Sequence, residues 1–347
     1  MKKLSLSIGI IAFSLAVVGL VSTNKAFASP GCTAIATGNW NNPAIWSNCN
    51  GAGGIPDPTD SVSISTDSTV TIDTAGTVAN SLYFYEPSTG SKGLTIVSPG
   101  SLSVTGAVVM RGSFGVGNST LAVGDGTLSA ASIEIDAGSS TGVASVSVST
   151  GTINISGSVT FFPFAPGGNA QLISTGASTI NIGGDLGNNG NVTTSGTGTI
   201  NFNGSGPQVM GAYTTYNNVT VTNTSGGVTL GGTVDINGTL TVNSGTLESG
   251  VNNLTVTGAT TVANGGTLLF SGNADQTFNG DVNLDAGSIW NETATPAIYF
   301  GGNFIDDSTS FTANTGPHVF TGTSKVINTP DDTIPELQVT SYRDSYK

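Results

Sequence analysis

Charged side chains are scarce in this sequence of 347 residues, since Asp, Glu, Lys and Arg together make up only 8% of it. Its 8 basic residues are outnumbered by 21 acidic ones, which gives a net charge of −13 at pH 7. Proteins that bind nucleic acid or anionic lipid use clustered Lys and Arg, so the composition argues against both partners. Anionic polysaccharide is disfavoured for the same electrostatic reason.

Histidine and cysteine are almost absent, with one and two residues respectively. The single histidine, His318, has no Cys, His or acidic neighbour at metal-ligand spacing in the sequence. A zinc site needs three or four protein ligands, and a catalytic triad needs a nucleophile and an orienting acid beside the histidine. We therefore expect His318 to be a surface or core residue, and no metal site or catalytic residue is predicted from it.

Long apolar runs are missing except near the start. Residues 1–28 have the form of a secretory signal peptide: Lys2 and Lys3, an apolar stretch from Ile8 to Val21, and Ala26-Phe27-Ala28 before the cleavage point. The apolar stretch is too short to span a bilayer comfortably. We expect a secreted or cell-surface protein without membrane insertion. Its mature net charge is about −16, obtained by removing Lys2, Lys3 and Lys25 from the total of −13.

A seven-residue phrase, Φ-x-Φ-x-Gly-x-Φ (Φ apolar), recurs along the chain with no helix-like segment between its copies. Alternation with period two, interrupted by glycine, predicts a short strand, a bend and a second short strand. Recurrence of such a unit predicts a stacked array that buries a shared core. The copies begin at Leu102, Ile153, Ile180, Val234, Leu254 and Ile298, and the fifth has Thr260 in its last position.

The repeats predict an all-β, single-stranded parallel β-helix, or β-solenoid, over residues 76–341. Spacing of the copies suggests coils of about 20–27 residues, roughly a dozen coils, and a rod on the order of 60 Å long. The 50 glycines are expected at corners where the backbone needs a positive φ, because glycine weakens ordinary strands. A right-handed winding is expected from the crossover preference of parallel strands.

The segment 29–75 differs from the repeats and holds both cysteines, Cys32 and Cys49. After export these two residues are expected to form a disulfide, worth roughly 3 kcal/mol for a loop of this length. The segment also carries Gly38-x-Trp40, Trp46, Pro56 and Asp60-x-Val62-x-Ile64. This pattern resembles the G-x-W…W…P…D-x-V-x-I opening segment of bacterial secreted β-helix surface proteins. The resemblance implies a cap on a right-handed parallel β-helix, with Trp40 and Trp46 packed over the end of the core.

A longer phrase, Phe202-x-Gly204-x-x-x-Gln208, returns as Phe270-x-Gly272-x-x-x-Gln276. This cadence resembles the repeats of bacterial adhesin-like and autotransporter-passenger-like proteins. We interpret its Gln as a corner residue that bonds the backbone. Residues 342–347 form a tail, and we expect either that the chain continues into a longer protein or that a partner covers the last rung.

Acidic residues provide few candidates for catalysis. Glycoside hydrolysis needs two carboxylates roughly 5–10 Å apart, and the candidates are Asp281/Asp285, Asp306-Asp307 and Asp331-Asp332. The two adjacent pairs are interpreted as solvated turns, since neighbouring residues of a strand point to opposite faces. No catalytic residue and no cofactor are predicted. Calcium is the one ion considered, with Asp125 and Asp306-Asp307 as turn ligands.

Outward-facing polar residues between the apolar pairs are the remaining candidate surface. If their positions stack from coil to coil, they form one polar ladder that could bind carbohydrate or, through Thr-x-Thr pairs, order water as ice-binding solenoids do. Ordinary β-propensity on a solvated face explains the same residues. The candidates are Asn154, Asn181, Asn201, Thr220, Asp235, Thr241 and Thr255.

These observations predict a non-enzymatic, extracellular structural or adhesive module at the bacterial cell surface, whose partner is carbohydrate or a surface protein. Two alternatives stay open. One is a carbohydrate-binding or polysaccharide-acting β-helix that uses an acidic groove around Asp281 and Asp285. The other is ice or surface binding through the threonines.

Overall fold

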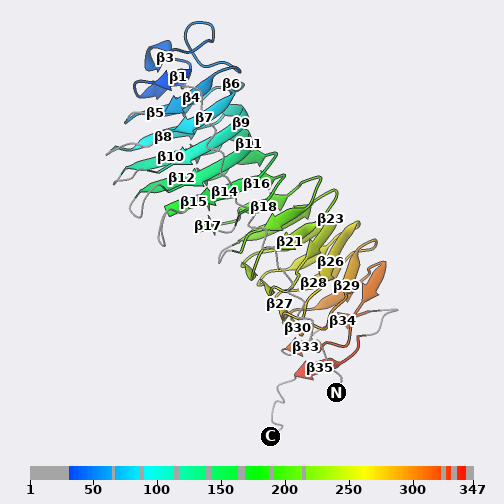
Figure 1. Cartoon of the computed structure of the whole chain (residues 1–347). Coiled ribbons are helices and arrows are strands. Elements are labelled where there is room, and N and C mark those ends of the chain that lie inside the picture. The colour runs from blue at the N-terminus through cyan, green and yellow to red at the C-terminus, as the bar shows by residue number, and fades with distance from the viewer. Residues whose placement is uncertain are drawn as a thin grey trace, which may run out of the picture.

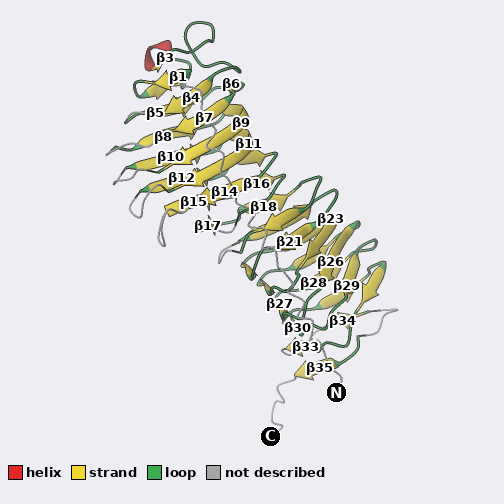
Figure 2. Cartoon of the chain, viewed as in Figure 1, coloured by secondary structure: helices red, strands yellow, loops and turns green. Residues whose placement is uncertain are grey.

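The computed structural model describes residues 31–64, 67–85, 90–112, 117–137, 142–162, 169–187, 191–212, 216–321, 326–329 and 334–340. Within these ranges the chain consists of strands and turns, apart from one 3-10 helix, η1 (Pro43–Ile45) (Figure 2). The predicted all-β solenoid is confirmed, with about 11 turns instead of the expected dozen. Successive coils stack into an elongated array (Figure 1). The predicted signal peptide, 1–28, and the tail, 342–347, lie outside the described residues.

Each coil contributes strands to three faces, and the strands within each face run parallel. The chain passes through the three faces in the same order in every coil. Face 1 begins with a seven-stranded sheet and continues, after a bridge between Tyr216 and Ile236, as a six-stranded sheet. Its strands are β2 (Gly38–Asn39), β5 (Thr69–Ile72), β8 (Lys92–Ile96), β10 (Asn118–Val123), β12 (Val143–Val148), β15 (Asn169–Ser174), β17 (Asn191–Thr194), β22 (Val234–Ile236), β24 (Leu254–Val256), β27 (Gln276–Phe278), β30 (Ile298–Phe300), β33 (His318–Thr321) and β35 (Leu337–Thr340).

Faces 2 and 3 are joined where the strands β9 (Ser101–Arg111), β11 (Thr127–Asp136) and β23 (Leu240–Glu248) bend from one face to the other. Face 2 also contains β6 (Thr77–Ala79), β13 (Thr152–Ile155), β16 (Thr179–Ile182), β18 (Thr199–Phe202), β20 (Asn218–Thr222), β25 (Thr260–Val262), β28 (Val282–Leu284), β31 (Phe304–Asp306) and β34 (Ile327–Asn328). Face 3 also contains β1 (Cys32–Ala34), β4 (Ser61–Ile64), β7 (Ser81–Phe84), β14 (Val159–Phe162), β19 (Gln208–Met210), β21 (Val228–Leu230), β26 (Gly266–Phe270), β29 (Ile289–Glu292) and β32 (Ser310–Thr312).

Coil length varies along the stack. Asn154 and Asn181 lie in adjacent coils and are 27 residues apart, whereas Asn181 and Asn201 are 20 apart. Contacts between coils in the C-terminal half commonly join residues 22 apart. After the cap, register partners in adjacent coils lie between 19 and 27 residues apart, so the predicted range of about 20–27 residues is confirmed to within one residue. The described chain fits a stack in which each rung adds about 4.8 Å.

The core is made of the inward residues of each strand, and its composition changes along the axis. In the N-terminal half, Leu94, Leu121 and Val146 occupy one register column and are fully buried. In the C-terminal half, aromatic rings fill the interior: Phe278 stacks on Phe300 with ring centroids 6.0 Å apart. Because inward side chains at equal register pack on each other, period-two alternation suffices to build a continuous core.

Glycines at the bends serve a different purpose from the one expected. A Cβ at Gly106 would lie 2.8 Å from the carbonyl oxygen of Asn80, and a Cβ at Gly157 would lie 2.7 Å from that of Ala131. Neither glycine has a positive φ. Glycine is required there because the backbone of the preceding coil passes too close for a side chain. The expectation of a positive φ holds at other corners, such as Gly245 in the bend of β23, where φ is 74°.

The N-terminal cap has the predicted parts. Cys32 and Cys49 form a disulfide, and β3 (Trp46–Ser47) pairs antiparallel with β1. Trp40 and Trp46 are buried with ring centroids 5.0 Å apart, and Nε1 of Trp46 donates a hydrogen bond to the carbonyl oxygen of Trp40 at 2.7 Å. These rings cover the first rung, which would otherwise expose core side chains.

Pro56 and Asp60 secure the loop that follows the disulfide. Pro56 is buried, and the Asp60 carboxylate accepts hydrogen bonds from the backbone N–H groups of Asn50 and Asp57, at 3.0 and 2.9 Å. The carbonyl oxygen of Asp60 accepts from the N–H of Asn80 in the next coil. Asp60 is thus a structural residue that ties the cap to the solenoid.

The predicted role of the phrase glutamines is also confirmed. Nε2 of Gln208 donates to the carbonyl oxygens of Ile182 and Gly184, and its Oε1 accepts from the N–H of Gly204. Gln276 makes equivalent bonds to Leu254, Asn252 and Ala274. Both side chains are buried at corners. They bond backbone groups at the turns, in addition to the bond that the carbonyl oxygen of Ile182 accepts from the N–H of Asn203 in the next coil.

Candidate functional site

Three asparagines on face 2 form a hydrogen-bonded amide ladder. Asn154, Asn181 and Asn201 occupy the same register position of β13, β16 and β18, between inward residues. Nδ2 of Asn181 donates to Oδ1 of Asn154 at 2.8 Å, and Nδ2 of Asn201 donates to Oδ1 of Asn181 at 3.0 Å. The stacking expected from the sequence is confirmed for these residues. Each amide keeps hydrogen-bonding capacity beyond the bonds within the ladder.

The same column continues through Thr220 and Thr241, which are in register with Asn201 and with each other. Asp235 and Thr255 do not belong to it: they pair with each other in β22 and β24, on face 1. The prediction of one ladder was wrong for these two residues. Outward positions look alike on every face, so alternation by itself does not tell which face a strand occupies.

The threonine pairs considered for ice binding are divided in the same way. The pairs Thr220/Thr222 and Thr239/Thr241 lie in or next to strands of face 2. The pair Thr255/Thr257 lies in and just after β24, on face 1. On face 2 the threonine column extends by Thr261 and is then followed by Asn283. These pairs therefore do not form one regular Thr-x-Thr array.

A shallow trough of about 620 Å³ runs beside the amide ladder, at the corner between faces 2 and 3. Its lining comes from consecutive coils and includes Ser129, Asn154, Asn181 and Asn203. All the side chains that line it are neutral. The trough can therefore hydrogen-bond a ligand through amides and hydroxyls, but it supplies no group for acid–base catalysis.

The carboxylates proposed for an acidic groove are not brought together. Asp281 and Asp285 lie at opposite ends of β28. At about 3.3 Å per residue their backbones are about 13 Å apart, beyond the spacing of a glycosidase pair. One oxygen of Asp281 accepts from the N–H of Asn303 in the next coil, at 2.7 Å. The structure therefore does not bring these two aspartates to the spacing of a glycosidase pair, and carbohydrate binding around Asp281 and Asp285 stays a prediction.

Asp306 and Asp307 point to opposite sides, as expected for neighbours, but the expectation of a solvated turn is wrong for Asp306. Asp306 is buried at the end of β31, while Asp307 is exposed. One Asp306 oxygen accepts from the N–H of Ser308 at 2.9 Å, and one Asp125 oxygen accepts from the N–H of Ser98 at 2.7 Å. Calcium binding at these aspartates stays a prediction. Asp331-Asp332 lies outside the described residues.

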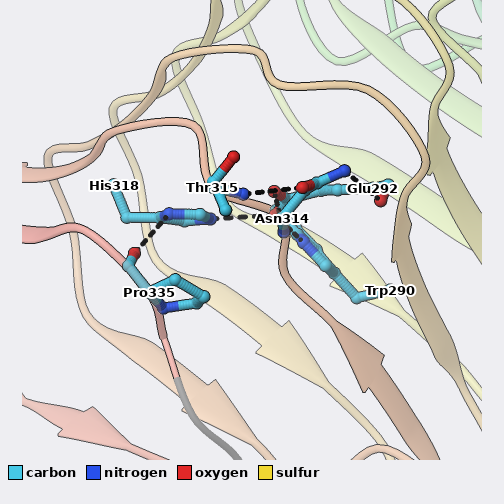
Figure 3. A network of polar contacts seen from close by, with 6 residues as sticks. All are labelled: Trp290, Glu292, Asn314, Thr315, His318 and Pro335. Atoms are coloured by element: carbon cyan, nitrogen blue, oxygen red, sulfur yellow. Dashed lines mark hydrogen bonds and ion pairs between the residues drawn. The ribbon is translucent and has the colours of Figure 1, made fainter.

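His318 is buried and has an acidic partner that the sequence did not indicate (Figure 3). Its Nε2 lies 2.9 Å from Oε1 of Glu292, which also accepts a hydrogen bond from Nε1 of Trp290 at 2.7 Å. Its Nδ1 lies 3.1 Å from the carbonyl oxygen of Pro335, and the N–H of Asn314 donates to Oε2 of Glu292.

This network connects β29, β33 and the segment before β35. The side chains of His318 and Glu292 have no exposed surface, so no substrate can reach them. Figure 3 shows the rings of His318 and Trp290 converging on the same carboxylate. We interpret the network as a clamp on the C-terminal coils. His318 is in register with Ile298, one coil of 20 residues earlier, and Glu292 precedes Ile298 by six residues, at the end of face 3. The contact therefore runs across a corner between two faces, which the sequence pattern did not show.

Cys32, Cys49 and Asp60 place ligand-type atoms within 4.8 Å of one another. The two sulfurs are joined in the disulfide, and a metal would require thiolates. This cluster is therefore part of the cap. Among the described residues, no helix is long and apolar enough to cross a bilayer.

Fold and site define a β-solenoid protein with a disulfide-stapled cap and a neutral polar trough. Comparisons with protein-family models, with curated proteins and with solved structures give no match. The resemblance to bacterial surface and adhesin-like proteins therefore stays a prediction.

Proposed function

We propose that this protein is a non-enzymatic, extracellular structural or adhesive module of a bacterial surface. The observation that carries the proposal is the stack of about 11 coils, which forms an elongated body (Figure 1). A stack in which each rung hydrogen-bonds to the next is suited to holding a binding surface away from its attachment point. The disulfide supports an oxidising, extracellular compartment.

The trough beside the amide ladder is the surface that we assign to adhesion. Its amides and hydroxyls both donate and accept, its lining is neutral, and two of its lining residues, Asn154 and Asn181, are joined by a hydrogen bond. Sugar hydroxyls have the same dual capacity, so a neutral carbohydrate fits this chemistry better than a charged partner. The acidic net charge of −13 further disfavours anionic partners.

The shape is tested by small-angle X-ray scattering of the secreted protein. About 11 coils at about 4.8 Å each give a body with a long dimension of about 50–60 Å along the stack. A scattering profile of a compact sphere would contradict the structural role.

Adhesion is tested with a substitution that fills the trough. Ser156 lines the trough and is exposed, so Ser156→Trp occupies the space without altering the three ladder amides. We expect binding to a panel of neutral polysaccharides to weaken by at least about tenfold, the factor for 1.4 kcal/mol. Thr257→Trp, at an exposed turn after β24, is the matched control and should bind normally. Equal binding by both variants would refute the trough, and release of shortened polysaccharide would refute the non-enzymatic role.

A further inference from the structure

A second cluster of polar and aromatic side chains lies on the outer surface of face 3, in the N-terminal half. Arg111 of β9 is in register with Asp136 of β11, which is in register with Phe162 of β14. Tyr85 follows Phe84, whose partner is Met110, and so occupies the position of Arg111 one coil earlier. The four residues form one row along the axis, and three rungs of about 4.8 Å place its ends about 14 Å apart.

The ends of this row are unusual for the molecule. Tyr85 is 57% exposed and Phe162 is 51% exposed, and they are the two exposed aromatic residues of the chain that the structure describes. Arg111, between them, is the one arginine in that part of the chain. Moving an aromatic ring out of water lowers the free energy. Two exposed rings that flank a charged centre are therefore a feature of binding surfaces.

Arg111 holds one of its two acidic neighbours more tightly than the other. Nη1 of Arg111 lies 3.1 Å from Oδ2 of Asp136, a hydrogen-bonded ion pair. Nη2 lies 3.6 Å from Oε1 of Glu134, which is too long for a hydrogen bond. Glu134 and Asp136 are two residues apart in β11, so both carboxylates face outward beside the row. Glu134 is therefore left with hydrogen-bonding capacity for a ligand.

The carboxyl group of Glu134 is partly shielded from water. Burial raises the pKa of its carboxyl group, Arg111 opposes that shift, and the negative charge of Asp136 adds to it. Tyr83 stands near it, and burial, followed by the charge of Glu134, raises the pKa of Tyr83 to about 12. A partly desolvated carboxylate gains more from a new hydrogen-bond donor than an exposed one does.

Stability by itself does not account for this arrangement. The side chains of Arg111 and Asp136 are 34% and 19% exposed. Ion pairs that water reaches contribute about 0–1 kcal/mol to the free energy of unfolding. Exposure of Tyr85 and Phe162 contributes nothing to the fold, because the coils are already held by their backbone bonds and inward side chains.

We propose that Tyr85, Arg111, Glu134, Asp136 and Phe162 form a binding site for a neutral oligosaccharide that lies along the axis of the solenoid. Sugar hydroxyls donate to Glu134 and accept from the remaining N–H groups of Arg111, and the apolar faces of two sugar rings stack on Tyr85 and Phe162. One arginine and two carboxylates leave a net negative charge, which disfavours acidic glycans. The central arginine disfavours amines. This site is separate from the trough, which lies at the corner with face 2.

The site is tested on the full secreted chain with an array of neutral, acidic and amino-sugar oligosaccharides. A neutral oligosaccharide found on the array is then titrated against the variants Phe162→Ala, Tyr85→Ala and Glu134→Gln. We expect Phe162→Ala and Tyr85→Ala each to weaken binding by about tenfold, the upper range for loss of one aromatic contact. We expect Glu134→Gln to weaken it by a similar factor, because a neutral amide replaces a charged acceptor of the sugar hydroxyls. Ile289→Ala removes an exposed apolar side chain from the same face in a distant coil and should leave the affinity unchanged.

Binding that is sensitive to Ser156→Trp but not to these three variants would overturn this site and would support the trough. Sensitivity to the three variants but not to Ser156→Trp would support this site and count against the trough. No binding of any neutral oligosaccharide, or binding of acidic glycans only, would overturn the proposal. Circular dichroism and unfolding temperature of each variant establish that a lost affinity is not a lost fold.

Discussion

The clamp formed by Glu292 makes a sharp prediction about the C-terminal coils. In Glu292→Gln, the side chain keeps its shape but has one acceptor oxygen and one NH₂ group in place of two acceptors. That oxygen can serve Trp290 and His318 on one side or Asn314 on the other, but not both. At least one donor, the part-buried N–H of Asn314 or the buried Nε1–H of Trp290, then faces another donor.

The cost follows from the burial of the network. Leaving a buried hydrogen-bond donor unsatisfied costs about 1–3 kcal/mol, and the Glu292 and His318 side chains have no exposed surface to relieve it. In a solenoid each coil contacts only its neighbours, so the loss is expected to stay local. Amide hydrogens of β30, β33 and β35 should exchange about 5–150 times faster, the factor for this free energy.

Hydrogen exchange read by mass spectrometry resolves the location. Peptides from β8, β10 and β12 serve as an internal reference and should be unchanged. Glu248→Gln is the matched control, because its one side-chain bond, from Oγ of Ser271, can be kept by an amide oxygen. Its effect should stay within about 0.5 kcal/mol. Unchanged exchange in Glu292→Gln, or equal acceleration at both ends of the stack, would refute the clamp.

Two further predictions concern the cap and the corners. Replacing Cys32 and Cys49 together by Ala opens a loop closed over 17 residues and should lower the stability of the cap by about 3 kcal/mol. Chemical unfolding followed by tryptophan fluorescence measures this loss. An unchanged unfolding midpoint would contradict a stapling role. Gly157→Ala brings a Cβ within 2.7 Å of the Ala131 carbonyl oxygen and should cost about 1–3 kcal/mol through overpacking. Gly206→Ala, with open space around its Cβ position, is the control, and equal unfolding temperatures for the two variants would show that close approach does not explain the corner glycines.

Much of the fold could be predicted because it depends on relations between neighbouring residues. Period-two alternation, the bend glycines and the spacing of the repeated phrase were enough to predict the parallel stack, the 20–27-residue coils and the stacking of Asn154, Asn181 and Asn201. The corner bonds of Gln208 and Gln276 were predicted from the longer phrase that contains them, and the packing of Trp40 and Trp46 was implied by the resemblance of the cap segment. Each of these features requires only that similar positions in adjacent coils meet.

Only the tertiary structure decided which side chains share a face and which distant groups meet. Asp235 and Thr255 lie on another face from the amide ladder, Asp281 and Asp285 are held apart by β28, and Glu292 meets His318. The row of Tyr85, Arg111, Asp136 and Phe162 emerged in the same way. The physical reason is that the face reached by a strand depends on the summed lengths of all turns before it. Alternation determines which side chains point into the core and which point outward. Because coil length varies, it does not determine which residue of the adjacent coil a given side chain meets.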